Sequence, residues 1–231
     1  MRYKFTGLQA ATLKIMMGNT AFQYQRRWYI DQRRIRHITK TRQCGADWYF
    51  SLEGLIDAIE TGRNQYFLAP TGAQASAFFR NRIAAFSAMA GVNIPVKDSL
   101  QRSAPPIMLS NGAELHFASP ESLVSGASGN VYLSEYAWCK HPSRLFKMAR
   151  GISCNNTFRF TAYTSPSKSD EAYSIWKNEH PDNKQRLSAQ EAVRQGCTLL
   201  DIDQLQSELS ADDFRLLFSA TWPQEKNEVV K

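Results

Sequence analysis

The sequence has few cysteines and histidines and lacks any long apolar run. No stretch of 18 apolar residues occurs, which excludes a membrane-spanning helix. Met1 to Ala10 contains no apolar core of the kind that a secretory signal peptide carries. Because the four cysteines form no C-x-x-C pair and no histidine spacing completes a zinc site, no zinc centre is expected. A disulfide framework is not expected either, because the chain is long and has few cysteines. These absences indicate a reducing, cytoplasmic setting.

The composition is sufficient for a folded core. Hydrophobic residues make up 43% of the chain and aromatic residues 12%, which excludes a wholly disordered protein. A chain of 231 residues fits one large domain or two small ones. Composition changes near His180, which predicts a main domain over residues 1–180 and a small helical linker or lid subdomain over residues 181–231. Residues 1–35 would form a basic helical segment within the main domain.

Positive charge is concentrated at the start of the chain. Residues 1–50 hold ten basic and two acidic residues, a net charge of +8, whereas the other residues sum to about −1. Such a segment indicates a polyanionic partner, either nucleotide phosphates or nucleic acid. A solvated basic face that binds nothing specific is the alternative. From the first interpretation we expect weak, salt-sensitive DNA binding through the N-terminal half, without base readout.

Apolar periodicity predicts alternating strands and helices. Helices are expected over residues 6–17, 22–31, 46–60, 73–91, 143–150, 188–195, 202–209 and 211–218. Strands are expected over residues 36–39, 64–69, 131–133 and 157–163, with a hairpin of 107–109 and 114–118 around Asn111-Gly112. This alternation predicts an α/β fold with a mainly parallel sheet and helices on both faces.

One strand–loop–helix segment has the spacing of a phosphate-binding loop. Lys40, Gly45 and Asp47 occupy the first, sixth and eighth places of the frame G-x-x-x-x-G-K-[ST], and the seventh place is Ala46. Such a loop wraps phosphates with backbone N–H groups, and the following helix adds its positive N-terminal dipole. A surface lysine followed by a glycine that merely starts a helix would give the same pattern.

This segment and four others resemble the large terminase subunits of tailed phages, the ATP-driven motors of DNA packaging. KTRQCGADW (40–48) looks like the family's deviant P-loop, in which the lysine stands at the front. YQRRW (24–28) is similar to the adenine-binding stretch, VYLSE (131–135) to the acidic strand end and YTSPS (163–167) to the coupling motif. Residues 196–214 resemble the end of the ATPase region. The motifs occur in the family's order, which is more specific than any one of them.

The resemblance implies a P-loop fold of the RecA/ASCE-like type, with ATP and Mg²⁺ as cofactors. It implies that Glu135 activates water and that Arg42 stabilises the charge of the transferring phosphoryl group. The nucleotide-binding residues that it implies are Lys40, Thr41, Gln43, Cys44, Gly45, Ala46, Tyr24, Gln25, Thr164 and Ser165. A structural ion pair for Arg42 and a core role for Tyr24 are the alternatives. Arg80 or Arg82 could act on a neighbouring subunit's nucleotide, or lie on a solvated face.

Two departures from the family pattern concern the metal. The eighth loop position is Asp47 in place of a hydroxyl residue, and the strand ends in Ser134-Glu135 in place of Asp-Glu. Either the function is lost, or the carboxylate and the hydroxyl have exchanged places, so that Asp47 and Ser134 ligate Mg²⁺. The sequence does not choose between them.

The resemblance therefore predicts an ATPase that drives double-stranded DNA into a procapsid. It implies a small terminase subunit and a portal protein as partners, a homo-oligomeric ring and a place in the host cytoplasm. No nuclease is expected, because no further acidic triad follows residue 200. A catalytically impaired nucleotide- or DNA-binding module from a prophage remnant is the alternative. A helicase-like domain of another family is a weaker third candidate.

Overall fold

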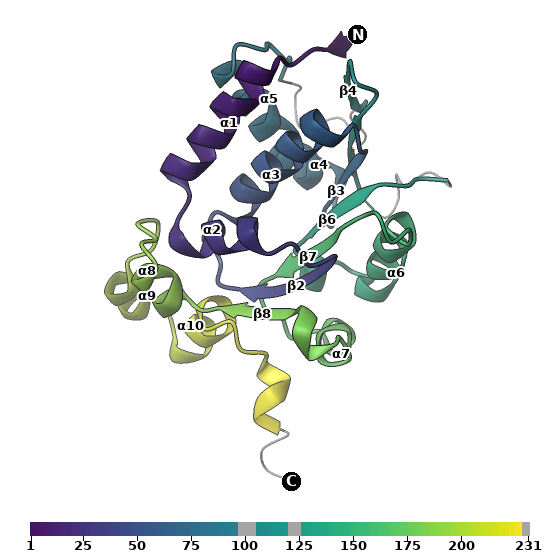
Figure 1. Cartoon of the computed structure of the whole chain (residues 1–231). Helices are drawn as coiled ribbons and strands as arrows, with labels where there is room; N and C mark the ends of the chain where they lie inside the picture. The colour runs from purple at the N-terminus through teal and green to yellow at the C-terminus, as the bar shows by residue number, and fades with distance from the viewer. Residues whose placement is uncertain (97–104, 120–125, 228–231) are drawn as a thin grey trace.

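An eight-stranded, mostly parallel sheet runs through the centre of the molecule (Figure 1). The computed structural model describes residues 1–96, 105–119 and 126–227. Across these residues the strand order is β1-β4-β5-β3-β6-β7-β2-β8, and every pair is parallel except β4 with β5. The strands are β1 (Arg2–Tyr3), β2 (Ile35–Lys40), β3 (Gln65–Leu68), β4 (Ile107–Leu109), β5 (Glu114–Ala118), β6 (Asn130–Ser134), β7 (Phe160–Thr164) and β8 (Lys184–Leu187).

Helices cover both faces of the sheet. The helices are α1 (Gly7–Thr20), α2 (Gln23–Ile30), α3 (Ala46–Thr61), α4 (Gly72–Ala75), α5 (Asn81–Met89), α6 (Pro142–Ile152), α7 (Asp170–Lys177), α8 (Ala189–Arg194), α9 (Ile202–Glu208) and α10 (Ala211–Phe218). One apolar cluster joins α1, α2, α3 and α5 to one face, and a second joins α6 and α7 to the other. Helices α8 to α10 lie together beside β8 (Figure 1). Among the described helices none is long and apolar enough to cross a bilayer.

The α/β prediction, with a mainly parallel sheet between helical layers, is confirmed. The hairpin around Asn111-Gly112 forms as β4 and β5, with Gly112 at a φ of 97°. Thr6 caps α1 through the backbone N–H of Gln9, as its position before the apolar pattern predicts. Gly62 ends α3 at a φ of 72°, a backbone conformation that glycine adopts without cost.

Three elements were not predicted from the sequence. Strand β8 lies inside residues 181–231, a segment that was interpreted as helical, and it pairs with β2 in the central sheet. Its residues Lys184, Gln185 and Arg186 are polar because it is an edge strand, so no apolar alternation marks it. The edge strand β1 is only two residues long, too short for a pattern to show it. Helix α7 begins at Asp170, beyond residue 163, where the predicted alternation of strands and helices ended. The division of the chain at residue 180 stays a prediction.

Two predicted helices differ in detail from the observed ones. Helix α1 continues past Gly18 to Thr20, because a glycine weakens a helix without forcing it to end. The helix predicted over residues 73–91 begins as α4 and ends as α5, and a π-helical turn over Ser76–Arg80 joins the two. Such turns are uncommon and occur often at functional sites.

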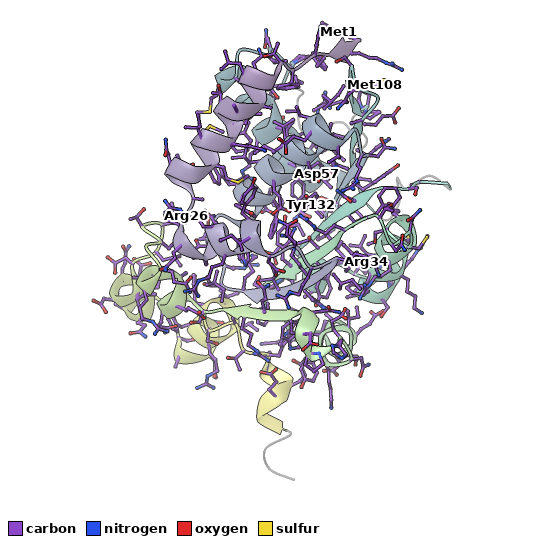
Figure 2. The ribbon with its side chains drawn as sticks, in the orientation of Figure 1. Met1, Arg26, Arg34, Asp57, Met108 and Tyr132 are labelled. Carbon is purple, nitrogen blue, oxygen red and sulfur yellow. The ribbon has the colours of Figure 1, made fainter. Side chains whose placement is uncertain are left out.

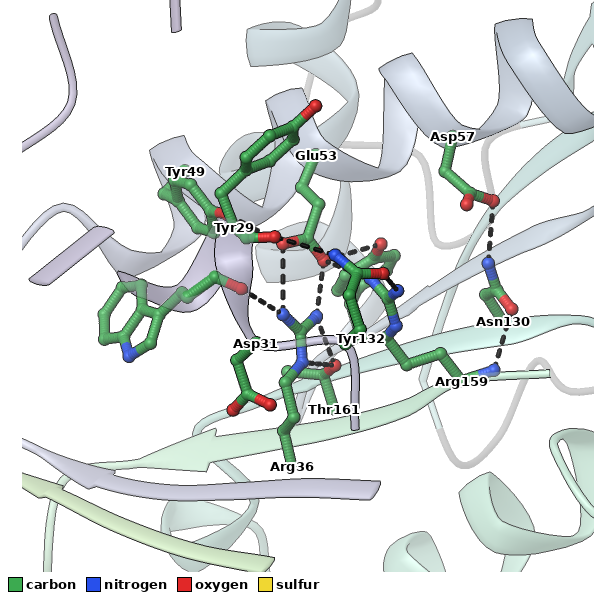
Figure 3. Close-up of polar contacts among 12 residues, drawn as sticks. Tyr29, Asp31, Arg36, Tyr49, Glu53, Asp57, Asn130, Tyr132, Arg159 and Thr161 are labelled. Atoms are coloured by element: carbon green, nitrogen blue, oxygen red, sulfur yellow. Dashed lines mark hydrogen bonds and ion pairs between the residues drawn. The ribbon is translucent and has the colours of Figure 1, made fainter. Parts of the chain in front are cut away.

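A buried charged network fixes β2 against α3 (Figure 3). Arg36 of β2 is fully buried, and its guanidinium donates to the Glu53 carboxylate of α3, to Thr161 Oγ1 of β7 and to the Trp28 carbonyl. Burial alone would raise the pKa of Glu53, but the charge and hydrogen bonds of Arg36, with smaller contributions from Arg159 and Tyr49, together hold that pKa below its ordinary value. The hydroxyls of Tyr49 and Tyr132 also donate to this carboxylate, at 2.8 and 3.1 Å.

Several basic residues of the N-terminal segment are paired with carboxylates, so only part of its positive charge is available to a polyanionic partner. Arg36 and Lys40 are buried and paired with carboxylates, and Arg33 pairs with Asp31. Figure 2 shows Arg26 beside α2 at the left of the view and Arg34 at the right, near α6. Some of the positive charges counted in residues 1–50 are therefore neutralised by ion pairs inside the protein. A count of charged residues along the sequence does not distinguish these from the exposed charges.

Candidate active site

The loop between β2 and α3 is held in a strained, compact shape. Gln43 and Gly45 adopt φ angles of 56° and 69°, in the region that favours glycine. The Tyr24 hydroxyl donates to the Cys44 carbonyl at 2.7 Å, and Gln25 Nε2 donates to the carbonyls of Cys44 and Gly45 at 3.4 and 3.2 Å. A Cβ on Gly45 would lie 3.1 Å from Gln25 Nε2, so glycine also allows this close approach.

The segment predicted as a separate subdomain supports the start of the same loop. The Thr41 backbone N–H donates to the Leu187 carbonyl of β8 at 2.7 Å, and that of Arg42 to the Leu217 carbonyl of α10 at 3.0 Å. Both bonds orient the backbone at the point where it leaves β2. The loop is therefore held by α2 on one side and by the C-terminal residues on the other.

Lys40 and Glu135 form an ion pair at the edge of the sheet where the parallel strands end. Lys40 ends β2 and Glu135 follows β6, and Lys40 Nζ contacts Glu135 Oε1. Burial alone would lower the pKa of Lys40, but the charge and hydrogen bond of Glu135, together with the charges of Asp47 and Cys44, raise that pKa above its ordinary value. Burial alone would likewise raise the pKa of Glu135, and Lys40 instead holds it below its ordinary value. Both side chains are therefore charged.

The turn after β7 holds the other oxygen of Glu135. Ser165 donates to Glu135 Oε2 through both its backbone N–H and its hydroxyl, each at 3.0 Å. Thr164 Oγ1 donates to the same oxygen at 3.3 Å. Glu135 itself has a φ of 50°, a conformation that costs free energy outside glycine and is concentrated at functional sites. Its carboxylate is thus fixed in place by two neighbouring strands.

Asp47 and Ser134 lie in contact. Ser134 Oγ donates to Asp47 Oδ1 at 2.7 Å, and the Tyr163 hydroxyl donates to the same oxygen at 2.8 Å. Burial raises the pKa of the Asp47 carboxyl, and Lys40 only partly offsets this. Among the described residues, Asp47 Oδ2 has no hydrogen bond, which leaves a hard oxygen at the pocket. A carboxylate beside a hydroxyl is a donor set that fits Mg²⁺, an ion that also keeps several waters.

These groups open into a pocket of about 430 Å³. Its lining combines both sides of the loop with residues from other elements: Lys40, Arg42, Gln43, Cys44, Gly45, Ala46, Asp47, Trp48, Pro70, Gln74, Phe78, Arg82, Glu135 and Trp138. The N-terminus of α3 points into it with a partial positive charge, and three basic side chains line it. A pocket of this size, in which three basic side chains outnumber the carboxylates of Asp47 and Glu135, suits a phosphate-bearing small molecule.

The structure brings most of the site residues expected from the sequence together, and their roles stay predictions. Lys40, Arg42, Gln43, Cys44, Gly45, Ala46, Asp47 and Glu135 line the pocket. Thr164 and Ser165 contact Glu135, and Ser134 contacts Asp47, so these three lie one layer behind it. Tyr24, Gln25 and Thr41 are buried and form hydrogen bonds that orient the loop's backbone, and the adenine contact of Tyr24 and Gln25 stays a prediction.

Several pocket residues were not assigned from the sequence. Trp138 ends the 3₁₀ turn that follows Glu135, and Gln74 and Phe78 come from α4 and the π-helical turn. Arg82 lines the pocket and donates to the Phe78 carbonyl at 2.6 Å, whereas Arg80 is buried and donates to the Pro105 carbonyl. Neither arginine therefore lies on a simple solvated face. Proximity to Glu135 was the one sequence signal that could have indicated Trp138.

Comparison with known proteins agrees with this geometry. Residues 37–228 match the sequence model of the family described as terminase large subunit, T4likevirus-type, N-terminal. The terminase, ATPase subunit, of Escherichia phage P2 is 34% identical over an alignment that covers 90% of this chain. The same alignment covers 40% of the phage P2 protein, so the chain spans less than half of that relative.

Two solved structures share the fold. The large terminase ATPase domain of Thermus phage P74-26 is 15% identical, with a TM-score of 0.60 over 89% of this chain and 95% of that one. The large terminase of a thermophilic bacteriophage, in complex with ADP, is 12% identical, with a TM-score of 0.60 over 93% of this chain and 52% of that one. At these identities the likeness concerns the fold alone.

Proposed function

The chain belongs to the family of T4-type terminase large subunits, N-terminal region, and on that premise we propose that it is an ATPase of viral DNA packaging. The observation that carries the proposal is the contact between Lys40 and Glu135 at one edge of a parallel sheet, beside a glycine-containing loop that opens a helix. A relative named as an ATPase subunit favours an active enzyme over an impaired module. The reaction is hydrolysis of the terminal phosphoryl group of ATP.

Three charged side chains of the pocket, Lys40, Arg42 and Glu135, have roles in that reaction. Lys40 and the backbone N–H groups before α3 bind the phosphates, and Arg42 offsets the negative charge that spreads over the transferring group. Glu135 accepts a proton from the attacking water. Before nucleotide binds, Lys40 is paired with Glu135, so phosphates must take over Lys40 and thereby release the carboxylate. Nucleotide binding and activation of Glu135 are then one event.

Mg²⁺ would be held by Asp47 and Ser134. Asp47 places a carboxylate at the loop position where the family has a hydroxyl, and Ser134 places a hydroxyl at the strand end where the family has a carboxylate. When bound, the ion neutralises phosphate charge and orients the terminal phosphoryl group. The 2.7 Å contact between the two side chains supports this exchange, because it places one carboxylate and one hydroxyl at a single point.

Asp47→Thr is expected to weaken Mg²⁺-dependent nucleotide binding, and adding Ser134→Asp should restore it. The first change removes the one carboxylate of the pair, and the second returns a carboxylate to the strand end. Calorimetric titration of ADP with Mg²⁺ measures the effect, and the same titration with EDTA is the internal control that should not change. If Asp47→Thr binds Mg²⁺–ADP as the unmodified chain does, the exchange is wrong. If only the double variant hydrolyses ATP, the natural chain is an impaired motor.

Lys40→Ala is the direct test of the nucleotide site. Loss of a charged hydrogen-bond donor to phosphate should weaken ATP binding about 10- to 100-fold. Lys14→Ala is the matched control, because Lys14 is a surface lysine paired with Glu60. ATP affinity and hydrolysis would be measured with and without double-stranded DNA. Equal affinities for the Lys40 variant and the control would place the nucleotide elsewhere.

The wider machine belongs to the same proposal. Double-stranded DNA is the translocated substrate, and a portal protein, a small terminase subunit and a ring of identical chains are the partners, in the host cytoplasm. Family membership supports these partners, whereas the charge count of residues 1–50 no longer does, because part of that charge is paired internally. DNA-stimulated ATP hydrolysis by the chain would support the translocation step directly.

A further inference from the structure

Trp138 occupies an unusual place beside the candidate site. It ends the 3₁₀ turn Tyr136–Trp138, directly after Glu135, and its side chain lines the pocket. The residue is 41% exposed, although a large apolar ring is usually buried where packing alone decides. Its backbone N–H donates to the Glu135 carbonyl at 3.0 Å, which fixes the turn.

The ring of Trp138 joins two segments that are far apart in the sequence. One face lies under Arg42 of the loop, with the guanidinium carbon 4.4 Å from the ring centroid. The indole N–H, at the edge of the ring, donates to both the carbonyl and the hydroxyl of Ser165, at 3.1 Å each. Ser165 in turn holds Glu135. The Trp138 side chain therefore contacts the loop through Arg42 and the turn after β7 through Ser165, and Ser165 connects it to Glu135.

Among the described residues, the ring of Trp138 provides the contact that holds the Arg42 side chain. The Arg42 backbone N–H is bonded to α10, but its side chain is partly exposed at the pocket and is held by the indole face. Tryptophan is the most favourable ring for a cation–π contact and arginine the more frequent cation, and such a contact restricts a long, flexible side chain. Without the ring, Arg42 could sample conformations that point into solvent.

We propose that Trp138 is a positioning residue that holds Arg42 over the phosphate pocket and Ser165 against Glu135. Movement of Arg42 onto bound phosphate is then transmitted through the ring to Ser165 and the turn after β7. The inference rests on the proposed function, because Arg42 and Glu135 act on ATP. It adds a residue that connects the loop, the glutamate and the turn.

Two substitutions separate the two contacts of the ring. Trp138→Phe keeps an aromatic face for Arg42 and removes the N–H that reaches Ser165. Trp138→Leu removes both. We expect Trp138→Leu to lower kcat about 10- to 100-fold with KM for ATP changed less than about 3-fold, and Trp138→Phe to recover part of the loss. Tyr29→Phe is the control, since Tyr29 is 42% exposed and lies outside the pocket.

The decisive step repeats both variants in an Arg42→Ala background. If the ring acts on Arg42, the Phe and Leu variants should there have the same rate, measured by single-turnover hydrolysis to resolve slow reactions. An unchanged difference between them would overturn the inference, as would a Trp138→Leu variant with the kcat of the Tyr29→Phe control. Thermal melting of all variants would check that the fold is kept.

A second measurement does not require turnover. Addition of Mg²⁺–ADP should change the tryptophan emission of the unmodified chain, and at least half of that change should be lost in Trp138→Phe. Retention of the full change overturns the inference. If neither the unmodified chain nor the Tyr29→Phe control hydrolyses ATP, the proposed function fails, whereas hydrolysis that is indifferent to Trp138 refutes only the role of the ring.

Discussion

Glu135→Gln is expected to keep nucleotide binding and to lower ATP turnover by about 10²- to 10⁴-fold. The amide has the shape of the carboxylate but cannot accept the proton of the attacking water. Binding should be unchanged or tighter, because the substitution removes the charge that pairs with Lys40 before phosphates arrive. Steady-state hydrolysis and ATP affinity, measured on the same preparation, separate the two effects.

A surface glutamate provides the control for this substitution. Glu208→Gln changes an exposed carboxylate of α9 whose neighbour is Gln204, so it should leave turnover unchanged. A Glu135→Gln variant that hydrolyses ATP at the unmodified rate would exclude Glu135 as the base. A variant that loses binding as well would show that the glutamate mainly shapes the Lys40 loop.

Long amphipathic segments and motif order were readable from the sequence. Helix α3 has apolar residues at helical spacing and a glycine at its end, so local preferences and packing agree. Strand β6 is a short apolar run that ends in Ser134-Glu135, and parallel strands place their carboxyl ends at one edge. These facts place Glu135 at the same edge of the sheet as Lys40, whereas their contact also depends on the strand order, in which only β7 separates β2 from β6.

The parts that were missed depend on contacts between distant residues. Strand β8 carries polar side chains and is defined by its hydrogen bonds to β2, which no local pattern shows. The hydrogen bonds from Tyr24 and Gln25 to the loop carbonyls were also not predicted, because only the folded chain places α2 directly behind that loop, and their contact with adenine stays a prediction. Trp138 has no motif of its own, and its two contacts join residues of the loop and the turn after β7.

The buried pair of Arg36 and Glu53 should be the most costly stability contact to break from one side. Glu53→Leu leaves a fully buried guanidinium without its carboxylate, and removing one partner of a buried pair costs about 3–5 kcal/mol. Chemical denaturation measures the loss in the free energy of unfolding. The exposed pair of Lys14 and Glu60 is the control, and Glu60→Gln should cost at most about 1 kcal/mol.

Replacing both partners tests whether the cost comes from the orphaned charge. Arg36→Met with Glu53→Leu should recover part of the stability, although the hydroxyls of Tyr49 and Tyr132 still lose their acceptor.

The stability that Glu53 contributes should depend on pH. The folded-state pKa of Glu53 lies below its ordinary 4.5, so the stabilisation by its ionised carboxylate is present above that pH and is lost as the pH falls through the folded-state pKa. The difference between the unmodified chain and Glu53→Leu should therefore shrink on acidification. A cost below about 1 kcal/mol at neutral pH, or one that grows in acid, would mean that the aromatic packing around the pair holds β2 against α3 without it.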